Sequence, residues 1–140
     1  MCVWGGWGAR GPPPPAGGGG GGVGPELTAW VRFTDGRTLD AAAVATLTDV
    51  LPPALYARWH TPRPVPTAEL TVHFTDALTP GADGAPALVR IRTERADGAW
   101  AVDDSAVWAA DGRLLALGRQ ARVVRAARPV AQPAAGTVNS

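Results

Sequence analysis

The stretch from Thr38 to Leu55 most constrains the fold, because it is the one clear helix pattern in a chain otherwise made of strands and turns. Thr38 or Asp40 can cap its first amides. Pro52 and Pro53 stop it, since proline lacks the backbone N–H that a helix needs. Apolar residues recur along it at helical spacing, at Leu39, Ala43, Val44, Leu47, Val50 and Leu51. The pattern predicts one long apolar helix that a sheet must wrap.

One residue of this helix is unusual for its position. Asp49 lies in the last predicted turn, where the helix dipole and the unpaired carbonyls favour a cation, so a carboxylate there costs about 0.3–1 kcal/mol. Such departures from a local rule are more common at functional sites. Position alone favours a solvated surface acid, and a functional group is the alternative.

The chain has 140 residues, a formal net charge of +1 and a single cysteine, Cys2. Its length suits one domain, and its charge gives no reason to expect nucleic acid or a membrane surface as a partner. No apolar run approaches the roughly 20 residues that span a bilayer. A lone cysteine excludes an internal disulfide and fits a reducing compartment. Composition therefore predicts a cytoplasmic protein.

Both ends of the chain have a composition of low complexity. Residues 1–25 combine Trp4 and Trp7 with runs of proline and glycine, which offer too little apolar surface to offset the entropy of ordering. The two tryptophans could bind a partner, but isolated aromatic residues in such a segment usually have no function. We expect a disordered Trp/Pro/Gly-rich linker over 1–25, a folded domain over 26–126 and a disordered tail over 127–140.

Two segments on either side of the helix have the pattern of strands. Leu27–Thr34 alternates well enough for a first strand, and Thr67–Thr75 alternates strictly. Leu70, Val72 and Phe74 share one side of the second segment, because successive side chains of a strand point to opposite faces. We therefore expect Thr67–Thr75 to be a half-buried strand.

Three further strands are predicted over Ala87–Arg95, Ala99–Ala109 and Arg113–Arg125. They are separated by Asp97-Gly98 and Asp111-Gly112, and Asp-Gly is among the strongest hairpin signals because both central residues of a type I′ turn need positive φ. The three strands should therefore form an antiparallel meander.

Two-residue loops in both hairpins would set the register of this meander. Asp104 then pairs with Arg119, and Asp103 lies opposite Arg92 and Gln120, as ordinary cross-strand pairs. The face expected to pack the helix carries Val89, Ile91, Thr93, Trp100, Val102, Asp104, Ala106, Trp108, Leu115, Leu117, Arg119, Ala121 and Val123. The polar face collects Arg90, Arg92, Glu94, Asp103, Ser105, Gln120 and Arg122. A bulge at Gly118 would move Gln120 to the other face.

The order of elements, a strand, a long helix and four antiparallel strands, is the order of a hotdog fold. The class is α+β. We expect a single hotdog, in which a curved antiparallel sheet of about five strands wraps one long helix.

Three separated motifs resemble a known family. They are LTDVL followed by PPALYARWHTPRPVPTAELTVHF, and then DDSAVWAADGRLLALGRQARVV near the end of the domain. Together they resemble the second, C-terminal hotdog of the tandem-hotdog acyl-CoA thioesterases, the thioesterase II or thioesterase-like superfamily. The resemblance extends from about Leu27 to Val124.

The resemblance implies an activity and a set of site residues. In that family an Asp on the hotdog helix, a Thr or Ser at the start of the next strand and a Gln on the last strand hold the hydrolytic water. Those positions fall on Asp49, Thr67 and Gln120. The expected function is hydrolysis of acyl-CoA thioesters to free acid and CoA, with no metal and no cofactor.

The residue types suit this chemistry. A thioester has a good leaving group, so one general base that deprotonates a positioned water can suffice, and such help is typically worth about 10²–10⁴-fold. Asp49 would be the base, and the Thr67 hydroxyl and the Gln120 amide would orient the water. A nucleophilic Asp49 that forms a mixed anhydride remains an open variant.

Other chemistries have weaker support in the sequence. There is no G-x-S-x-G elbow, and the serines are Ser105, in a predicted strand, and Ser140, at the terminus. His60 and His73 lack metal-ligand spacing, and a structural or loop role is favoured for each. The glycine run at 17–22 lacks the Lys-Ser of a phosphate loop.

The family carries two hotdogs in one chain, and here the Trp/Pro/Gly segment stands in place of the first. A lone copy should expose an apolar stripe, so we expect a homodimer through the hotdog helix. The alternative is a catalytically weak or inactive acyl-CoA-binding or assembly domain, a truncated remnant of a tandem-hotdog thioesterase.

Four arginines lie along the last predicted strand and just after it. Arg119, Arg122, Arg125 and Arg128 could contact the phosphates of CoA. A solvated basic face is the simpler interpretation and is favoured.

Overall fold

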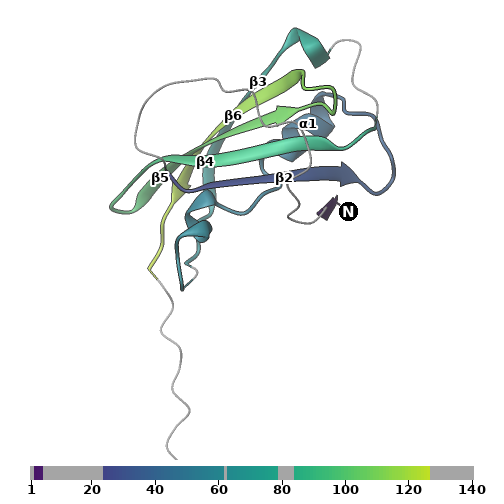
Figure 1. The fold of residues 1–140 in the computed structure, drawn as a ribbon. Coiled ribbons are helices and arrows are strands. Elements are labelled where there is room, and N and C mark those ends of the chain that lie inside the picture. Colours follow the sequence, from purple (N-terminus) through teal and green to yellow (C-terminus); the bar gives the residue numbers. More distant parts are fainter. Residues whose placement is uncertain (1, 5–23, 62, 79–83, 127–140) are drawn as a thin grey trace, which may run out of the picture.

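The computed structural model describes residues 2–4, 24–61, 63–78 and 84–126. One antiparallel sheet has the strand order β1-β2-β4-β5-β6-β3, and one α-helix lies against one of its faces (Figure 1). The strands are β1 (Cys2–Trp4), β2 (Glu26–Phe33), β3 (Thr67–Phe74), β4 (Ala87–Asp97), β5 (Trp100–Trp108) and β6 (Leu114–Val123). The helices are α1 (Ala41–Thr48) and two short 3-10 turns, η1 (Ala54–Ala57) and η2 (Asp76–Leu78). The predicted α+β hotdog architecture, five main strands around one helix, is confirmed.

The predicted length of the helix is wrong. Asp40 is the N-cap, as expected, and its carboxylate accepts a hydrogen bond from the Ala43 amide at 2.8 Å. The α-helix ends at Thr48, whose hydroxyl donates to the Ala45 carbonyl. The residue before a proline disfavours helical torsions, so the Pro52-Pro53 pair prevents the chain from continuing the helix through Leu51. Asp49 is therefore the C-cap of a short helix.

The assignment of the meander's faces is also wrong, because of one extra residue. From Trp100 to Val107 the register of β5 with β6 is as predicted, with Asp104 opposite Arg119 and Asp103 opposite Gln120. It shifts at Trp108, which pairs with Leu114, so the connection is longer than the predicted two residues. The register of β4 with β5, however, shifts between Thr93 and Arg95. Such a bulge reverses the alternation of a strand.

The polar set of β5 and β6 consequently faces the helix. Asp103, Ser105, Gln120 and Arg122 are all buried there, at 4% exposure or less. A Cβ added at Gly118 would lie against Thr48 of the helix, so Gly118 belongs to the same face. It pairs with Ser105 within a regular stretch of register, so the bulge considered at Gly118 is absent and the one near Thr93 has the same effect.

The core lies between the sheet and the segment that contains α1 and η1. Its fully buried side chains come from α1, from the segment before it and from strands β2, β4, β5 and β6. They include Val31, Leu39, Val44, Leu47, Val89, Ile91, Val107 and Leu115. Burial of an aliphatic side chain of this size is worth about 1.5–3 kcal/mol relative to exposure. On the opposite face Leu88, Ala106 and Trp108 form a smaller cluster, and the Arg90 guanidinium lies 5.1 Å above the Trp108 ring.

The edge strand β3 is exposed rather than half-buried as predicted. Only Val72 is partly buried, and Leu70 and Phe74 are 37% and 46% exposed. The exposed residues of α1 itself are small or polar, Ala41, Ala42 and Thr46. The expectation of an apolar stripe on the helix is therefore wrong for the described residues. Their large exposed apolar side chains all lie on strands.

Candidate active site

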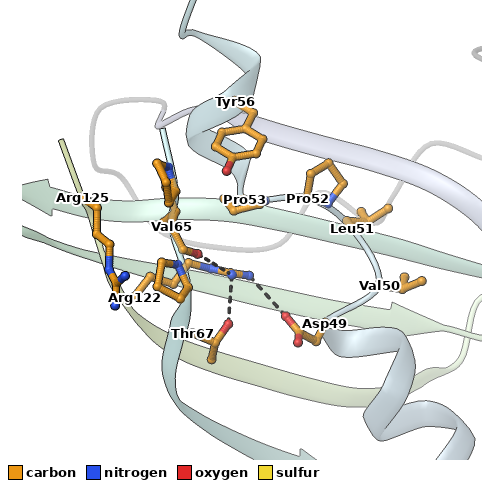
Figure 2. Close-up of a pocket in the computed structure, with 12 residues that line it drawn as sticks. Asp49, Val50, Leu51, Pro52, Pro53, Tyr56, Val65, Thr67, Arg122 and Arg125 are labelled. Atoms are coloured by element: carbon orange, nitrogen blue, oxygen red, sulfur yellow. Dashed lines mark hydrogen bonds and ion pairs between the residues drawn. The ribbon is translucent and has the colours of Figure 1, made fainter. Parts of the chain in front are cut away.

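Asp49 lies at the mouth of an open hollow. Its side chain is 47% exposed, and the hollow has a volume of about 850 Å³. The walls come from the segment after α1 and from the loop that enters β3, and they are rich in apolar residues: Val50, Leu51, Pro52, Pro53, Tyr56, Pro64, Val65 and Pro66 (Figure 2). Thr67, Arg122 and Arg125 complete the lining. The hollow thus has apolar walls and a carboxylate at one side.

Gln120 forms a direct hydrogen bond with Asp49. It is fully buried on β6, and its Nε2 donates to Asp49 Oδ1 at 2.5 Å. Its Oε1 accepts a hydrogen bond from Nη2 of Arg122. Two predicted site residues, 71 positions apart in the chain, are therefore in contact because α1 ends over strand β6.

Thr67 reaches the same group through Arg122. It is the first residue of β3 and lies opposite Arg122 in register, with the register shifting just after it. Its Oγ1 accepts from Nη1 of Arg122 at 2.9 Å. No hydrogen bond joins Thr67 to Asp49 or Gln120 in the described structure, so the arginine connects the third predicted residue to the other two.

Asp103 was not predicted as a site residue, and the solvated basic face favoured for Arg122 is wrong, because Arg122 is buried. The side chains of Arg122 and Asp103 are 4% and 0% exposed, and Arg122 Nε lies 2.8 Å from Asp103 Oδ2, an ion pair without the angle of a directional hydrogen bond. Asp103 Oδ1 accepts from the Thr93 hydroxyl at 2.7 Å. The predicted pairing of Asp103 with Gln120 could have identified this group. It did not, because both residues were assigned to the polar face of the sheet, away from the helix.

The remaining candidates lie apart from this group. His60 and His73 are exposed, and Ser105 is buried without a hydrogen-bond partner for its hydroxyl. Arg125 lines the hollow, whereas Arg119 bonds Asp104 on the opposite face. Within the described ranges no three His, Cys, Asp or Glu side chains form a metal-binding cluster. Trp7, Arg128, Ser140 and the glycine run at 17–22 lie outside those ranges.

The fold and this group define a hotdog domain, and comparison with known proteins places it in a family. Residues 6–124 match the model of the acyl-CoA thioesterase C-terminal domain. The chain belongs to that family. None of the curated proteins searched matched the sequence.

Solved structures agree with this placement. A conserved hotdog-fold protein of unknown function from Alicyclobacillus acidocaldarius is 30% identical, with a TM-score of 0.66 over 77% of this chain and 41% of that one. A protein assigned as a thioesterase II from Thermobifida fusca is 28% identical, with a TM-score of 0.60 over 74% of this chain and 39% of that one. The chain thus spans about two fifths of these relatives.

A smaller protein shares the fold over most of its length. It comes from Streptococcus mutans, was solved bound to acetyl-CoA, and is 13% identical, with a TM-score of 0.60 over 76% of this chain and 86% of that one. At this identity the likeness concerns the fold alone. Separately, none of the described helices has the length and apolar character needed to cross a membrane.

Proposed function

We propose that this domain hydrolyses acyl-CoA thioesters to free acid and CoA, with Asp49 as the general base. Family membership supports the thioester substrate. The observation that carries the proposal is the contact of Gln120 with Asp49 at the edge of an apolar hollow, since it holds a carboxylate where an acyl group could lie.

The hydrogen bonds of Asp49 leave one oxygen for the reaction. Oδ1 accepts from Gln120 and, at 3.4 Å, from Arg122, whereas Oδ2 has no partner among the described residues. In the proposed step a water donates a proton to Oδ2 while its oxygen attacks the thioester carbonyl. The tetrahedral intermediate then expels the CoA thiolate, which takes up the proton held by Asp49, and the free acid is released. The Thr67 hydroxyl, which already accepts from Arg122, keeps its own hydrogen to orient the water.

One chemical variant remains part of the proposal. Asp49 could instead attack the carbonyl itself and form a mixed anhydride that water then hydrolyses.

The ligand and the site of action are also part of the proposal. The fold that this chain shares with the Streptococcus mutans protein, which was solved with acetyl-CoA, supports an acyl-CoA ligand. The lone cysteine in the sequence agrees with a cytoplasmic site of action, where acyl-CoA hydrolysis would serve fatty acid metabolism.

The second candidate is a non-catalytic acyl-CoA-binding or assembly domain. The observation in its favour is that the chain spans only 41% and 39% of the length of two relatives, so the activity of the whole relatives need not reside in this domain alone. Homodimerisation through the helix remains a prediction. The exposed edge strand β3, with Leu70 and Phe74, offers a larger apolar surface than α1 does.

Thiol release from acyl-CoAs of several chain lengths tests the proposal. We expect turnover by the wild type and a loss of about 10²–10⁴-fold in Asp49→Asn, which keeps the shape of the side chain but removes the base. Asp104→Asn is the matched control, because Asp104 lies on β5 and bonds Arg119 on the face of the sheet away from Asp49. Equal inactivity of the wild type and both variants, with acyl-CoA still bound, would favour the non-catalytic domain.

A further inference from the structure

We propose that Arg122, through its buried ion pair with Asp103, is a positioning residue that sets the orientation of Gln120 and Thr67 around Asp49. The inference rests on the proposed hydrolysis for its catalytic meaning. Its structural content is independent of activity, because it concerns where one guanidinium directs the side chains around it.

Both Nη atoms of the guanidinium donate hydrogen bonds, and Nε forms an ion pair without the angle of a hydrogen bond. An arginine offers five N–H groups in a fixed plane and accepts no hydrogen bond. Nε faces Asp103 Oδ2 at 2.8 Å. Nη1 donates to Thr67 Oγ1 at 2.9 Å and to the Val65 carbonyl at 3.5 Å (Figure 2). Nη2 faces Gln120 Oε1 and, at 3.4 Å, Asp49 Oδ1. No donor is left for a substrate, so the residue acts through its neighbours.

The first consequence concerns the amide of Gln120. Because Arg122 can only donate, the amide oxygen must face it, and the NH₂ group must then face Asp49. Oxygen and nitrogen of an amide are otherwise interchangeable in shape. With the arginine in place, the 2.5 Å contact to Asp49 is a donated hydrogen bond rather than a repulsion between two oxygens.

The second consequence concerns Thr67. Its hydroxyl accepts from Nη1, so its hydrogen is free to point into the hollow. Thr67 is on the exposed edge strand, where little packing restrains a side chain. The arginine therefore connects an exposed position to the buried Gln120 and to Asp49.

Asp103 and Thr93 explain why the guanidinium stays in one orientation. Asp103 is fully buried, and its other oxygen is held by the Thr93 hydroxyl at 2.7 Å. The side chains form a chain from β4 through β5 to β6 and then to the end of α1. A planar fork is needed at its centre, because a lysine ammonium in the same place is a point charge without directional pairing.

The test uses Arg122→Lys, which retains the charge, and Asp103→Asn, which retains the shape. Arg119→Lys and Asp104→Asn are matched controls from the exposed pair on the same two strands. For thiol release we expect kcat to fall by about 10²-fold in Arg122→Lys, the scale of a misplaced catalytic group, with KM changed less than about 3-fold. The controls should stay within about 2-fold of the wild type.

A double-variant cycle separates positioning from general damage. If Arg122 acts through Gln120, the Arg122→Lys change should cost little in a Gln120→Ala background. Multiplicative losses, or a rise in KM with kcat unchanged, would overturn the proposal. Circular dichroism and melting curves confirm that each variant is folded.

A second readout does not depend on activity. The side-chain NH₂ resonances of Gln120 in a ¹⁵N-labelled chain should show slow exchange with water in the wild type and in Arg119→Lys, and faster exchange in Arg122→Lys and Asp103→Asn. An inert wild type with this pattern would contradict the proposed hydrolysis but keep the positioning of Gln120. Active variants with unchanged Gln120 exchange would contradict the positioning itself.

Discussion

Two Arg–Asp pairs lie side by side on β5 and β6, one on each face of the sheet. Arg119 and Asp104 meet outside through two hydrogen bonds of 2.7 Å each, with 65% and 34% of their side chains exposed. Arg122 and Asp103 meet inside at 2.8 Å, with 4% and 0% exposed. The outer pair has the better bidentate geometry, and its hydrogen bonds to Asp104 raise the pKa of Arg119.

This difference shows that burial, rather than hydrogen-bond geometry, decides what an Arg–Asp pair can do. Water screens the outer pair, so we expect it to contribute under about 1 kcal/mol. The inner pair cannot turn to solvent, and each donor of Arg122 must find a protein acceptor. Three of those acceptors are the side chains proposed to hold and activate water.

The strongest test of this comparison is to remove each arginine in turn. Arg122→Met leaves Asp103 buried without its partner, so we expect a loss of about 3–5 kcal/mol in the free energy of unfolding. Arg119→Met should cost about 1 kcal/mol or less. Urea denaturation of both variants measures the difference.

A compensating change sharpens this first test. Arg122→Met combined with Asp103→Leu replaces the ion pair with apolar side chains, and such replacements are often neutral or stabilising. We expect the double variant to regain most of the lost stability and to remain inactive toward acyl-CoA. Losses that simply add would mean that the two residues do not act as a buried pair.

A smaller effect is expected from filling the space over Gly118. An added Cβ would lie 2.5 Å from Ser105 Oγ and 3.1 Å from Thr48 Cβ, so Gly118→Ala should cost about 1–3 kcal/mol through overpacking between α1 and the sheet. Leu117→Ala, 46% exposed on the outer face, should stay within about 0.5 kcal/mol. Thermal and urea unfolding compare the two.

Ser105→Ala checks the cause of that cost. The Ser105 hydroxyl is buried without a hydrogen-bond partner, so its removal should be neutral or slightly stabilising. It also removes the atom nearest to the added Cβ, so Gly118→Ala should cost less in the Ser105→Ala background. Equal costs in both backgrounds would place the clash elsewhere.

The smallest effect concerns an exposed pair of the outer type. The side-chain hydrogen bond from Arg37 lowers the pKa of Asp35 to about 2. Because this pKa is lower in the folded than in the unfolded chain, ionised Asp35 stabilises the fold above the ordinary carboxyl pKa, and that contribution disappears as the pH falls toward about 2. NMR titration of the Asp35 carboxyl measures the midpoint, and Arg37→Gln should bring it back toward the ordinary value.

Sequence patterns alone determined much of this molecule. The Asp-Gly signals predicted the meander, and the predicted pairing of Asp104 with Arg119 is observed. The predicted two-residue Asp-Gly loops are wrong, because Asp97 itself pairs with Trp100 and the connection from Trp108 to Leu114 is longer. Asp40 was predicted as a possible cap from its side chain alone. Resemblance to the family pointed to Asp49 and Gln120, which the fold brings into contact.

Only the tertiary structure decided which face those residues occupy. One extra residue between Thr93 and Arg95 reverses a period of two, and no local pattern marks it. That bulge turned Asp103, Gln120 and Arg122 inward, beneath the end of α1. Whether an arginine is a solvated surface charge or the centre of a buried group depends on what covers it, and the covering element here lies more than 70 residues earlier in the chain.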